Sequence, residues 1–282
     1  MRSRIDLQAM RRVALAFAFT FALLCTGAVT MPATASDAVP RVAVLVYHRF
    51  GETAADSMTV RVETFEAQLR MLRAHGYRFV ALRDVVDWIE GERDSLPPKV
   101  VALTVDDGHR SVFDTLRPIA LRENLPITLF IYPSAISNAS YALTWDQLRA
   151  LRASGSFDVQ SHTYWHPNFN IERARLSHDD FEAFAAMQLQ KSRASLETHL
   201  QIHVDLLAWP FGIVDDELVQ MARAAGYRAA FGLGGHLIDR QSPPFRLSRL
   251  LIVDGDTPAV LARLLGEPAS AEHDTHLKEP KP

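Results

Sequence analysis

Two adjacent acids, Asp106 and Asp107, stand where a short apolar segment ends. The preceding residues, 99–105, are rich in valine and predict a buried strand, and Gly108 follows the acids. Two neighbouring carboxylates repel each other, so folding alone gives no reason to place them at a strand end. Because Asp-Gly is a common turn pair, a turn is the alternative to a functional site.

Two histidines further along the chain, His162 and His166, are four positions apart. On a helical turn this spacing puts both imidazoles on one side, where they can hold one cation. Asp107 would complete a set of two histidines and one carboxylate, which leaves positions open for water and substrate. One divalent ion, with zinc, cobalt, nickel or iron as candidates, suits these ligands. Asp106 would then act as general base on water. The alternative is that both histidines are ordinary polar residues of a loop.

Alternating strand and helix patterns must position these residues. Strands are expected at 41–47, 77–80, 99–105, 127–132, 157–160, 206–209, 228–231 and 247–253. Helices are expected at 63–75, 83–91, 111–123, 144–154, 177–200, 215–225 and 257–265. Such alternation predicts parallel strands covered by helices, in a barrel or a doubly wound sheet. His48, the two acids, the two histidines and residues 210–212 each follow an expected strand, where barrels form their sites.

Composition limits the function classes. The 282 residues are 48% hydrophobic and carry a formal net charge of −3. This length and apolar content support one domain with a sizeable core. The chain lacks the basic patch that nucleic-acid binders usually show.

The N-terminus predicts a secretory signal peptide over residues 1–35. An apolar stretch, 13–29, follows four arginines, and a small-residue cleavage site ends at Ala35. Residues 1–35 carry a net charge of +3, so the remainder carries −6, which argues against adhesion to anionic membranes. Cleavage near Ala35 would leave a periplasmic or extracellular protein, and an uncleaved anchor is the alternative. The sole cysteine, Cys25, lies in the apolar stretch, so the mature chain would have no disulfide. We expect one catalytic domain over 36–270 and a flexible tail over 271–282.

Three motifs resemble those of the polysaccharide deacetylases, the NodB-homology group or carbohydrate esterase family 4. They are residues 104–108 (Thr-Val-Asp-Asp-Gly), 161–167 (Ser-His-Thr-Tyr-Trp-His-Pro) and 209–212 (Trp-Pro-Phe-Gly). The resemblance spans about residues 40 to 255. It implies an α/β fold, a distorted (β/α) barrel of about seven parallel strands. It also implies metal-dependent hydrolysis of N-acetyl groups from an amino-sugar polysaccharide, with release of acetate.

The resemblance also implies residue roles. Asp106 would be the base, while Asp107, His162 and His166 would hold the metal. The backbone N–H near Phe211 would stabilise the oxyanion. Trp209, Pro210 and Gly212 of the third motif are expected beside the substrate.

Two departures from the family pattern matter. Ala208 stands where the family often has an arginine, and no clean match is found for the histidine acid of the fifth motif. Arg249, on the last expected strand, either acts near the site or faces solvent. These departures, with His48 after the first strand, resemble the branch that deacetylates poly-N-acetylglucosamine. His48 is therefore a candidate proton donor, with a buried structural histidine as the alternative, and His236 is a weaker candidate.

Aromatic residues lie beside the expected site. Trp165 is expected to form a platform for a sugar ring, although aromatic residues more often pack in cores. Trp88 and Trp145 are expected to pack within helices. Two other functions fit the same fold: a carbohydrate-binding protein without strong catalysis, and an amidase acting on peptidoglycan or another non-peptide C–N bond. The sequence indicates no protein partner.

Overall fold

The computed structural model describes residues 40–268. The expected signal peptide, 1–35, and the expected tail, 271–282, lie outside the described residues. The expected domain, 36–270, extends beyond them by a few residues at each end.

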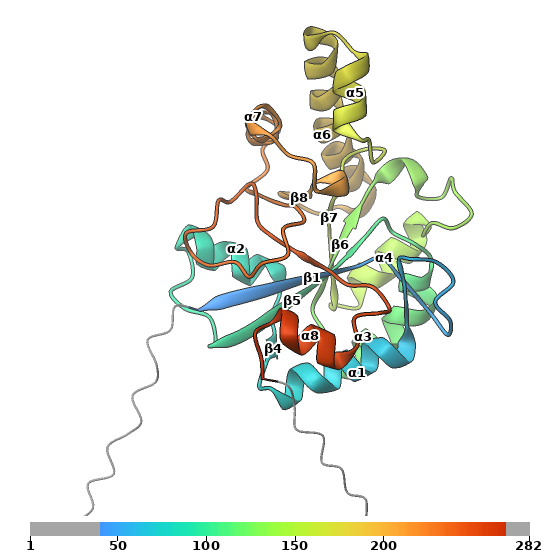
Figure 1. Cartoon of the computed structure of the whole chain (residues 1–282). Helices are drawn as coiled ribbons and strands as arrows, with labels where there is room; N and C mark the ends of the chain where they lie inside the picture. Colours follow the sequence, from blue (N-terminus) through green and yellow to red (C-terminus); the bar gives the residue numbers. More distant parts are fainter. Residues whose placement is uncertain (1–39, 269–282) are drawn as a thin grey trace, which may run out of the picture. The chain divides into compact units, whose positions relative to one another are not determined.

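A curled sheet of eight parallel strands forms the centre of the fold (Figure 1). Seven strands follow one another in the order β10-β1-β5-β6-β7-β8-β9, and β4 pairs with β5 beside this path. The strands are β1 (Arg41–Tyr47), β4 (Arg78–Phe79), β5 (Lys99–Asp106), β6 (Ile127–Ile131), β7 (Phe157–Ser161), β8 (Leu206–Ala208), β9 (Ala229–Phe231) and β10 (Leu250–Leu251). A separate parallel pair contains β2 (Arg49–Gly51) and β3 (Thr59–Arg61).

The segment 247–251 joins the two ends of the sheet. Leu247 bridges Phe231 of β9, while Leu250 pairs with Leu45 of β1. The strand expected over 247–253 is shorter in the structure, because this segment pairs first with β9 and then with β1. The prediction of a distorted (β/α) barrel of about seven parallel strands is confirmed.

Helices cover the outside of the sheet, except the helix Leu82–Glu90, which packs against the inner face (Figure 1). They are α1 (Val62–Ala74), α2 (Leu82–Glu90), α3 (Arg117–Glu123), α4 (Trp145–Ala153), α5 (Phe169–Arg175), α6 (His178–Leu200), α7 (Asp216–Ala224) and α8 (Pro258–Leu264). Single turns are a π-helix, η1 (Val112–Leu116), and the 3₁₀ turns η2 (Pro133–Ala135) and η3 (Pro210–Gly212). Thr144 caps α4 in the predicted capping box with Gln147.

Alternate residues of each strand point to opposite faces of the sheet, as the two-residue period of a strand requires. One face packs against the outer helices, and residues such as Leu103 and Leu129 belong to that core. The other face forms a smaller core with the apolar side of α2, and Phe130 and Phe231 belong to it. Asp106 pairs in register with Phe130, so its carboxylate points to the same face, the interior of the barrel.

Two local features differ from the predictions. The helix expected over 111–123 begins as the π-helix η1, because Pro118 lacks an N–H and its ring crowds the preceding turn. α5 was not predicted; the Asn168 side chain caps its first turn, accepting hydrogen bonds from the N–H groups of Asn170 and Ile171.

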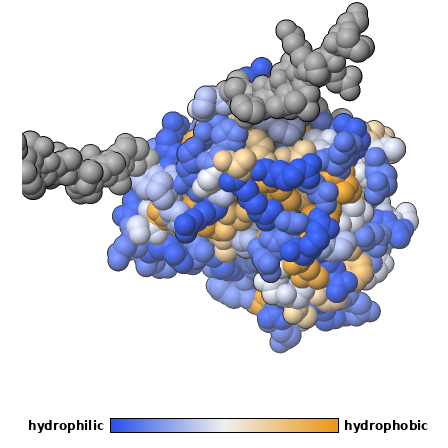
Figure 2. Space-filling model, turned by 90° about the horizontal axis from the view of Figure 1, so that it is seen from below, coloured by the Kyte–Doolittle hydropathy of each residue, from blue (hydrophilic) through white to orange (hydrophobic). Residues whose placement is uncertain are grey.

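Among residues 40–268, no helix combines the length and the apolar character needed to cross a membrane. Figure 2 shows the face where α1 and α8 lie, seen from below; hydrophilic residues cover most of it, with apolar ones between them. Apolar atoms on a surface of this kind are ordinary for folded proteins.

Candidate active site

Four predicted residues meet at the carboxyl ends of β5 and β7. His162 Nε2 lies 3.8 Å from Asp107 Oδ1, and His166 Nε2 lies 3.7 Å from the same oxygen. One ligand atom from each of these three residues falls within 4.8 Å of the others. Asp106 is adjacent, with its Oδ2 3.6 Å from His162 Nε2. The adjacent parallel strands β5, β6 and β7 place these residues at one end of the barrel.

The turn after β5 explains why a glycine follows the two acids. Asp107 and Gly108 both have left-handed backbones, with φ of 72° and 74°. A side chain at Gly108 would strain this backbone, and its Cβ, 2.9 Å from Ile131 Cδ1, would require Ile131 to shift. Asp107 adopts the same left-handed backbone conformation, which is uncommon for a residue with a side chain. The tight turn places a carboxylate oxygen of each acid within 4 Å of His162 Nε2.

The two histidines do not lie on a helical turn, and that part of the prediction is wrong. Thr163 and His166 adopt left-handed backbones, with φ of 63° and 62°, so the chain between the histidines is an irregular loop. The loop still brings the two imidazole rings together, with centroids 4.6 Å apart. Sequence spacing predicted the meeting of the rings but not the backbone that produces it.

Buried side chains hold this loop in place. Ser161 Oγ accepts a hydrogen bond from the Thr163 N–H, and Gln188 Oε1 on α6 accepts one from the Trp165 N–H. The Tyr227 hydroxyl donates to Ser161 Oγ at 2.8 Å. Backbone N–H groups of the loop therefore bond to side chains that are themselves buried in the core.

Arg249 resolves an alternative that the sequence left open. Its side chain is 1% exposed and faces the site. Both of its terminal nitrogens donate to Asp106, to Oδ1 and to Oδ2, each at 2.7 Å. The guanidinium also lies over the Phe130 ring, 5.2 Å from its centroid. This two-point contact fixes the orientation of the Asp106 carboxylate.

The two acids differ in the direction in which the site shifts their pKa. Burial by itself would raise the pKa of Asp106, but the nearby charge of Arg249, with His162, lowers it to about 2. Burial, together with the neighbouring charge of Asp106, raises the pKa of Asp107. Burial lowers the pKa of His162 to about 3 and also lowers the pKa of His166. Both imidazoles are therefore neutral at pH 7, the form in which histidine binds metals.

The residues fit a divalent cation. His162 Nδ1 donates to the Ala208 carbonyl at 2.7 Å, so its Nε2 carries the free lone pair toward Asp107. Asp107 Oδ1 is buried and has no hydrogen-bond partner among the described residues. An orphaned buried carboxylate oxygen facing two neutral imidazoles is the donor set of a zinc-type site.

A cavity of about 210 Å³ opens over these groups. It is lined by His48, Met58, Asp106, Asp107, His162, His166, Trp209, Phe211, Leu233, Arg249 and Leu251. His48 reaches it from the end of β1, and His48 Nδ1 is buried without a hydrogen-bond partner among the described residues. Met58, Leu233 and Leu251 were not predicted; as isolated apolar residues in loops and strands they carried no chemical signal.

The third motif forms one wall of this cavity. Trp209 is buried, and its Nε1 donates to the Phe245 carbonyl at 3.0 Å. The Phe211 ring is exposed and lies edge-on to His166, with centroids 4.7 Å apart. Gly212 has a φ of 70°, and a Cβ there would lie 3.0 Å from Leu233. Pro210 begins the η3 turn that positions these residues.

Four other residues named in the sequence analysis lie outside this cavity. Trp165 is 47% exposed and packs edge-on against Phe184, but it does not line the cavity. His236 is exposed in its loop and is not part of the lining. Trp145 stacks on His199 and Trp88 is buried, as expected of packing residues.

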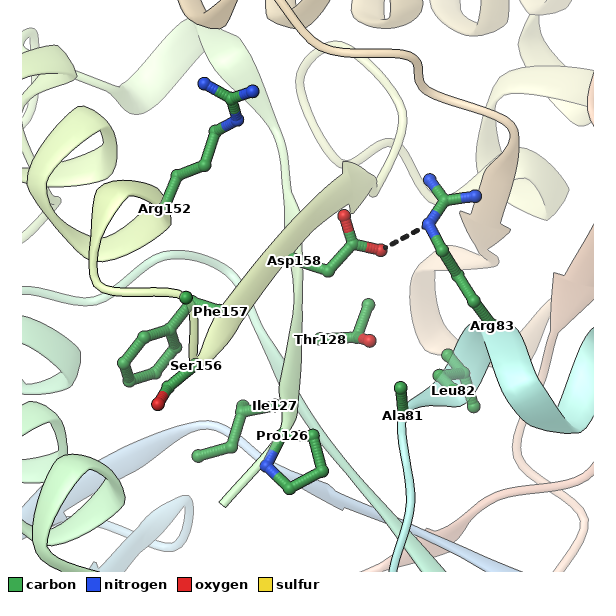
Figure 3. Close-up of a pocket in the computed structure, with 11 residues that line it drawn as sticks. Ala81, Leu82, Arg83, Pro126, Ile127, Thr128, Arg152, Ser156, Phe157 and Asp158 are labelled. Atoms are coloured by element: carbon green, nitrogen blue, oxygen red, sulfur yellow. Dashed lines mark hydrogen bonds and ion pairs between the residues drawn. The ribbon is translucent and has the colours of Figure 1, made fainter. Parts of the chain in front are cut away.

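A second cavity, of about 310 Å³, contains none of the candidate residues (Figure 3). It lies at the amino ends of β6 and β7, near the start of α2. Asp158 pairs there with Arg83 at 3.1 Å (Figure 3). Because parallel barrels carry their chemistry at the carboxyl ends of the strands, the smaller cavity is the candidate active site.

Comparisons with known proteins agree with this geometry. Residues 93–230 match the family model described as polysaccharide deacetylase. A poly-beta-1,6-N-acetyl-D-glucosamine N-deacetylase of Staphylococcus epidermidis is 22% identical over 208 residues, which cover 72% of this chain and 71% of that protein. A protein of the same name from Staphylococcus aureus is 21% identical over 200 residues, 70% of this chain and 68% of that one.

Solved structures share the fold. The Streptococcus pyogenes deacetylase PplD, solved in complex with acetate, has a TM-score of 0.71 at 22% identity, covering 82% of this chain and 100% of that one. IcaB from Ammonifex degensii also has a TM-score of 0.71, at 24% identity, covering 80% of this chain and 97% of that one.

Proposed function

We propose, from the premise that this chain belongs to the polysaccharide deacetylase family, that it uses one divalent cation to remove N-acetyl groups from an amino-sugar polysaccharide. The enzyme is a hydrolase of carbon–nitrogen bonds other than peptide bonds. The substrate would resemble poly-N-acetylglucosamine, the polymer in the names of the curated relatives. The convergence of Asp107, His162 and His166 beside Asp106 is the observation that carries this proposal.

The cation would be held by Asp107, His162 and His166, with zinc as the first choice and cobalt, nickel or iron as alternatives. When bound, it would supply Lewis-acid chemistry, polarising the acetyl carbonyl and making a water molecule easier to deprotonate. The neutral imidazoles and the orphaned Asp107 oxygen support this choice of ligands.

Asp106 would accept the proton of the attacking water. Its low pKa keeps it ionised at neutral pH, and Arg249 holds its plane fixed. As the water oxygen bonds to the acetyl carbon, negative charge moves to the carbonyl oxygen, which the Phe211 backbone N–H would stabilise. The C–N bond then breaks, releasing acetate and leaving the electron pair on the sugar nitrogen.

The leaving amine needs a proton, and His48 is the proposed donor. It lines the same cavity as the two acids, and its Nδ1 is free of partners among the described residues. Trp209, Pro210 and Gly212 would shape the wall on which the acetylated sugar rests, and Trp165 would contact more distant sugar units. Export through the segment 1–35 would place the enzyme in the periplasm or outside the cell.

Replacing Asp106 with Asn tests the proposal directly. Asp106→Asn keeps the side-chain shape but removes the base, so we expect acetate release from N-acetylglucosamine oligomers to fall by about 10²–10⁴-fold. Metal content, measured on the same protein, should stay at one ion per chain. Asp107→Asn is the matched neighbour and should lose the ion as well. Acetate release at the wild-type rate by Asp106→Asn would exclude Asp106 as the base.

A further inference from the structure

An exposed tyrosine, Tyr141, stands beside the candidate site without being part of the cavity. It is connected to the site through Tyr132, whose ring lies 5.5 Å from the His166 ring. The two tyrosine hydroxyls are 2.8 Å apart and form a hydrogen bond. Tyr132 therefore lies between Tyr141 and His166, a candidate metal ligand.

The Tyr141 ring is held in a fixed orientation at the surface. It is 43% exposed, yet it lies nearly parallel to the His109 ring, at 9° and 6.4 Å between centroids. The His109 ring and the Tyr132 hydroxyl hold the ring in this orientation while part of it stays open to solvent. A flat ring with its hydroxyl already bonded offers its face to the C–H side of a sugar ring.

The loop that carries Tyr141 is tied to the turn of the two acids. The Arg110 N–H donates to the Tyr141 carbonyl at 2.8 Å, and the Leu143 N–H donates to the Gly108 carbonyl at 2.9 Å. His109 and Ala142 form an antiparallel bridge between the two segments. This backbone pairing sets the position of the ring before any ligand arrives, which lowers the entropic cost of binding.

A polar cavity of about 400 Å³ lies beside the loop that carries Tyr141, although Tyr141 itself does not line it. Ser140 and Ala142, the residues on either side of Tyr141, belong to its lining. The other lining residues include Arg110, Ser137, Asn138, Thr144 and Gln147. Thr144 and Gln147 already bond to each other in the α4 cap, and Ser137 Oγ accepts from the Trp145 N–H. The Ser140 hydroxyl and the terminal nitrogens of Arg110 have no such partner among the described residues. Groups of these kinds donate and accept hydrogen bonds to sugar hydroxyls and acetamido groups.

The geometry points to a second sugar-binding subsite, in which Tyr141 stacks on a sugar unit adjacent to the reacting one and the polar cavity binds its substituents. Rigid aromatic surface beside adaptable polar groups is a common design of recognition sites. The subsite rests on the proposed function, because it binds the same polymer whose acetyl group enters the catalytic cavity. Its effect would be a preference for oligomers over single sugars.

The test compares substrates of different length. With the zinc-loaded full chain, acetate release is measured on N-acetylglucosamine and on its pentamer. We expect Tyr141→Ala to lower the pentamer-to-monomer ratio of kcat/KM about tenfold. Tyr141→Phe keeps the ring and should keep most of that ratio. Leu121→Ala, at an exposed apolar residue of α3, is the control and should leave the ratio unchanged.

Two results would overturn the subsite: an unchanged ratio in Tyr141→Ala, or an equal fall in Tyr141→Phe, which would assign the effect to the Tyr132 hydrogen bond.

If the wild-type protein releases no acetate from any oligomer, the proposed function fails while the subsite stays testable. Calorimetric binding of the pentamer to Asp106→Asn then replaces kinetics. Adding Tyr141→Ala should weaken that binding about tenfold, and unchanged binding would refute the subsite.

Discussion

Asp106 and Arg249 form a buried ion pair, in which each carboxylate oxygen accepts one hydrogen bond from the guanidinium. A carboxylate oxygen has two acceptor sites, so each oxygen keeps one for water. Burial alone would favour the protonated form of Asp106, and the charge of Arg249 keeps the carboxylate ionised. The same charge that keeps the base ionised also makes it a weaker base.

Arg249→Lys should raise the pKa of Asp106, because lysine offers a point charge in place of the two-pronged contact. Protonation of Asp106 switches off the base as the pH falls. The acidic limb of the kcat/KM profile should therefore move to higher pH in the variant. Arg246→Lys, at an exposed arginine paired with Asp216, is the control. An acidic limb at the wild-type pH in Arg249→Lys would show that Arg249 does not set this pKa.

The pair also links stability to pH. The pKa of Asp106 is about 2 in the folded chain, below the ordinary aspartate value of 3.8, so the folded state favours the ionised form. Its contribution to stability is present above pH 3.8 and is lost as the pH falls through about 2. Breaking such a buried pair costs about 3–5 kcal/mol, so Arg249→Met should unfold more easily than Arg249→Lys.

At the scale of elements, α6 supports the loop between the two histidines. Gln188, fully buried on α6, accepts from the Trp165 N–H next to His166. Ser192, also on α6, hydrogen-bonds to Ser161, which precedes His162. The left-handed backbones at Thr163 and His166 need such support, because residues with side chains adopt them at a cost.

Gln188→Leu should weaken zinc binding about tenfold, as loss of an outer partner of a metal site commonly does. The Trp165 N–H would lose its buried acceptor, and the loop could then shift. Gln68→Leu is the matched control: Gln68 is equally buried, on α1, and bonds to Tyr47 and to the Asp256 carbonyl. Both variants should lose stability, but only Gln188→Leu should change the Kd for zinc in a chelator competition. Equal zinc affinity in the two variants would remove Gln188 from the support of the site.

Sequence patterns predicted the elements that have a regular period. Valine-rich segments and helical periodicity gave most of the strands and helices, and the capping box at Thr144 is present as expected. The loop from His162 to His166 escaped prediction because its shape depends on hydrogen bonds to α6, far along the chain. Arg249 was ambiguous for the same reason: its direction depends on how 247–251 crosses from β9 to β1.

At the scale of the whole molecule, the parallel barrel explains why distant residues form one site. β5, β6 and β7 are neighbours, so the turn after β5 and the loop after β7 open at the same end. β1, β8 and the segment 247–251 bring His48, the third motif and Arg249 to that end. The barrel interior below is filled by apolar residues and α2, which closes the opposite side.

The central claim is that Asp107, His162 and His166 hold the cation on which catalysis depends. The most direct measurement is acetate release from N-acetylglucosamine oligomers by chelator-treated protein, before and after one equivalent of zinc is added. We expect no release from the treated protein and full recovery with zinc, while His162→Ala should not recover. Undiminished release by protein shown to contain no metal would contradict the claim.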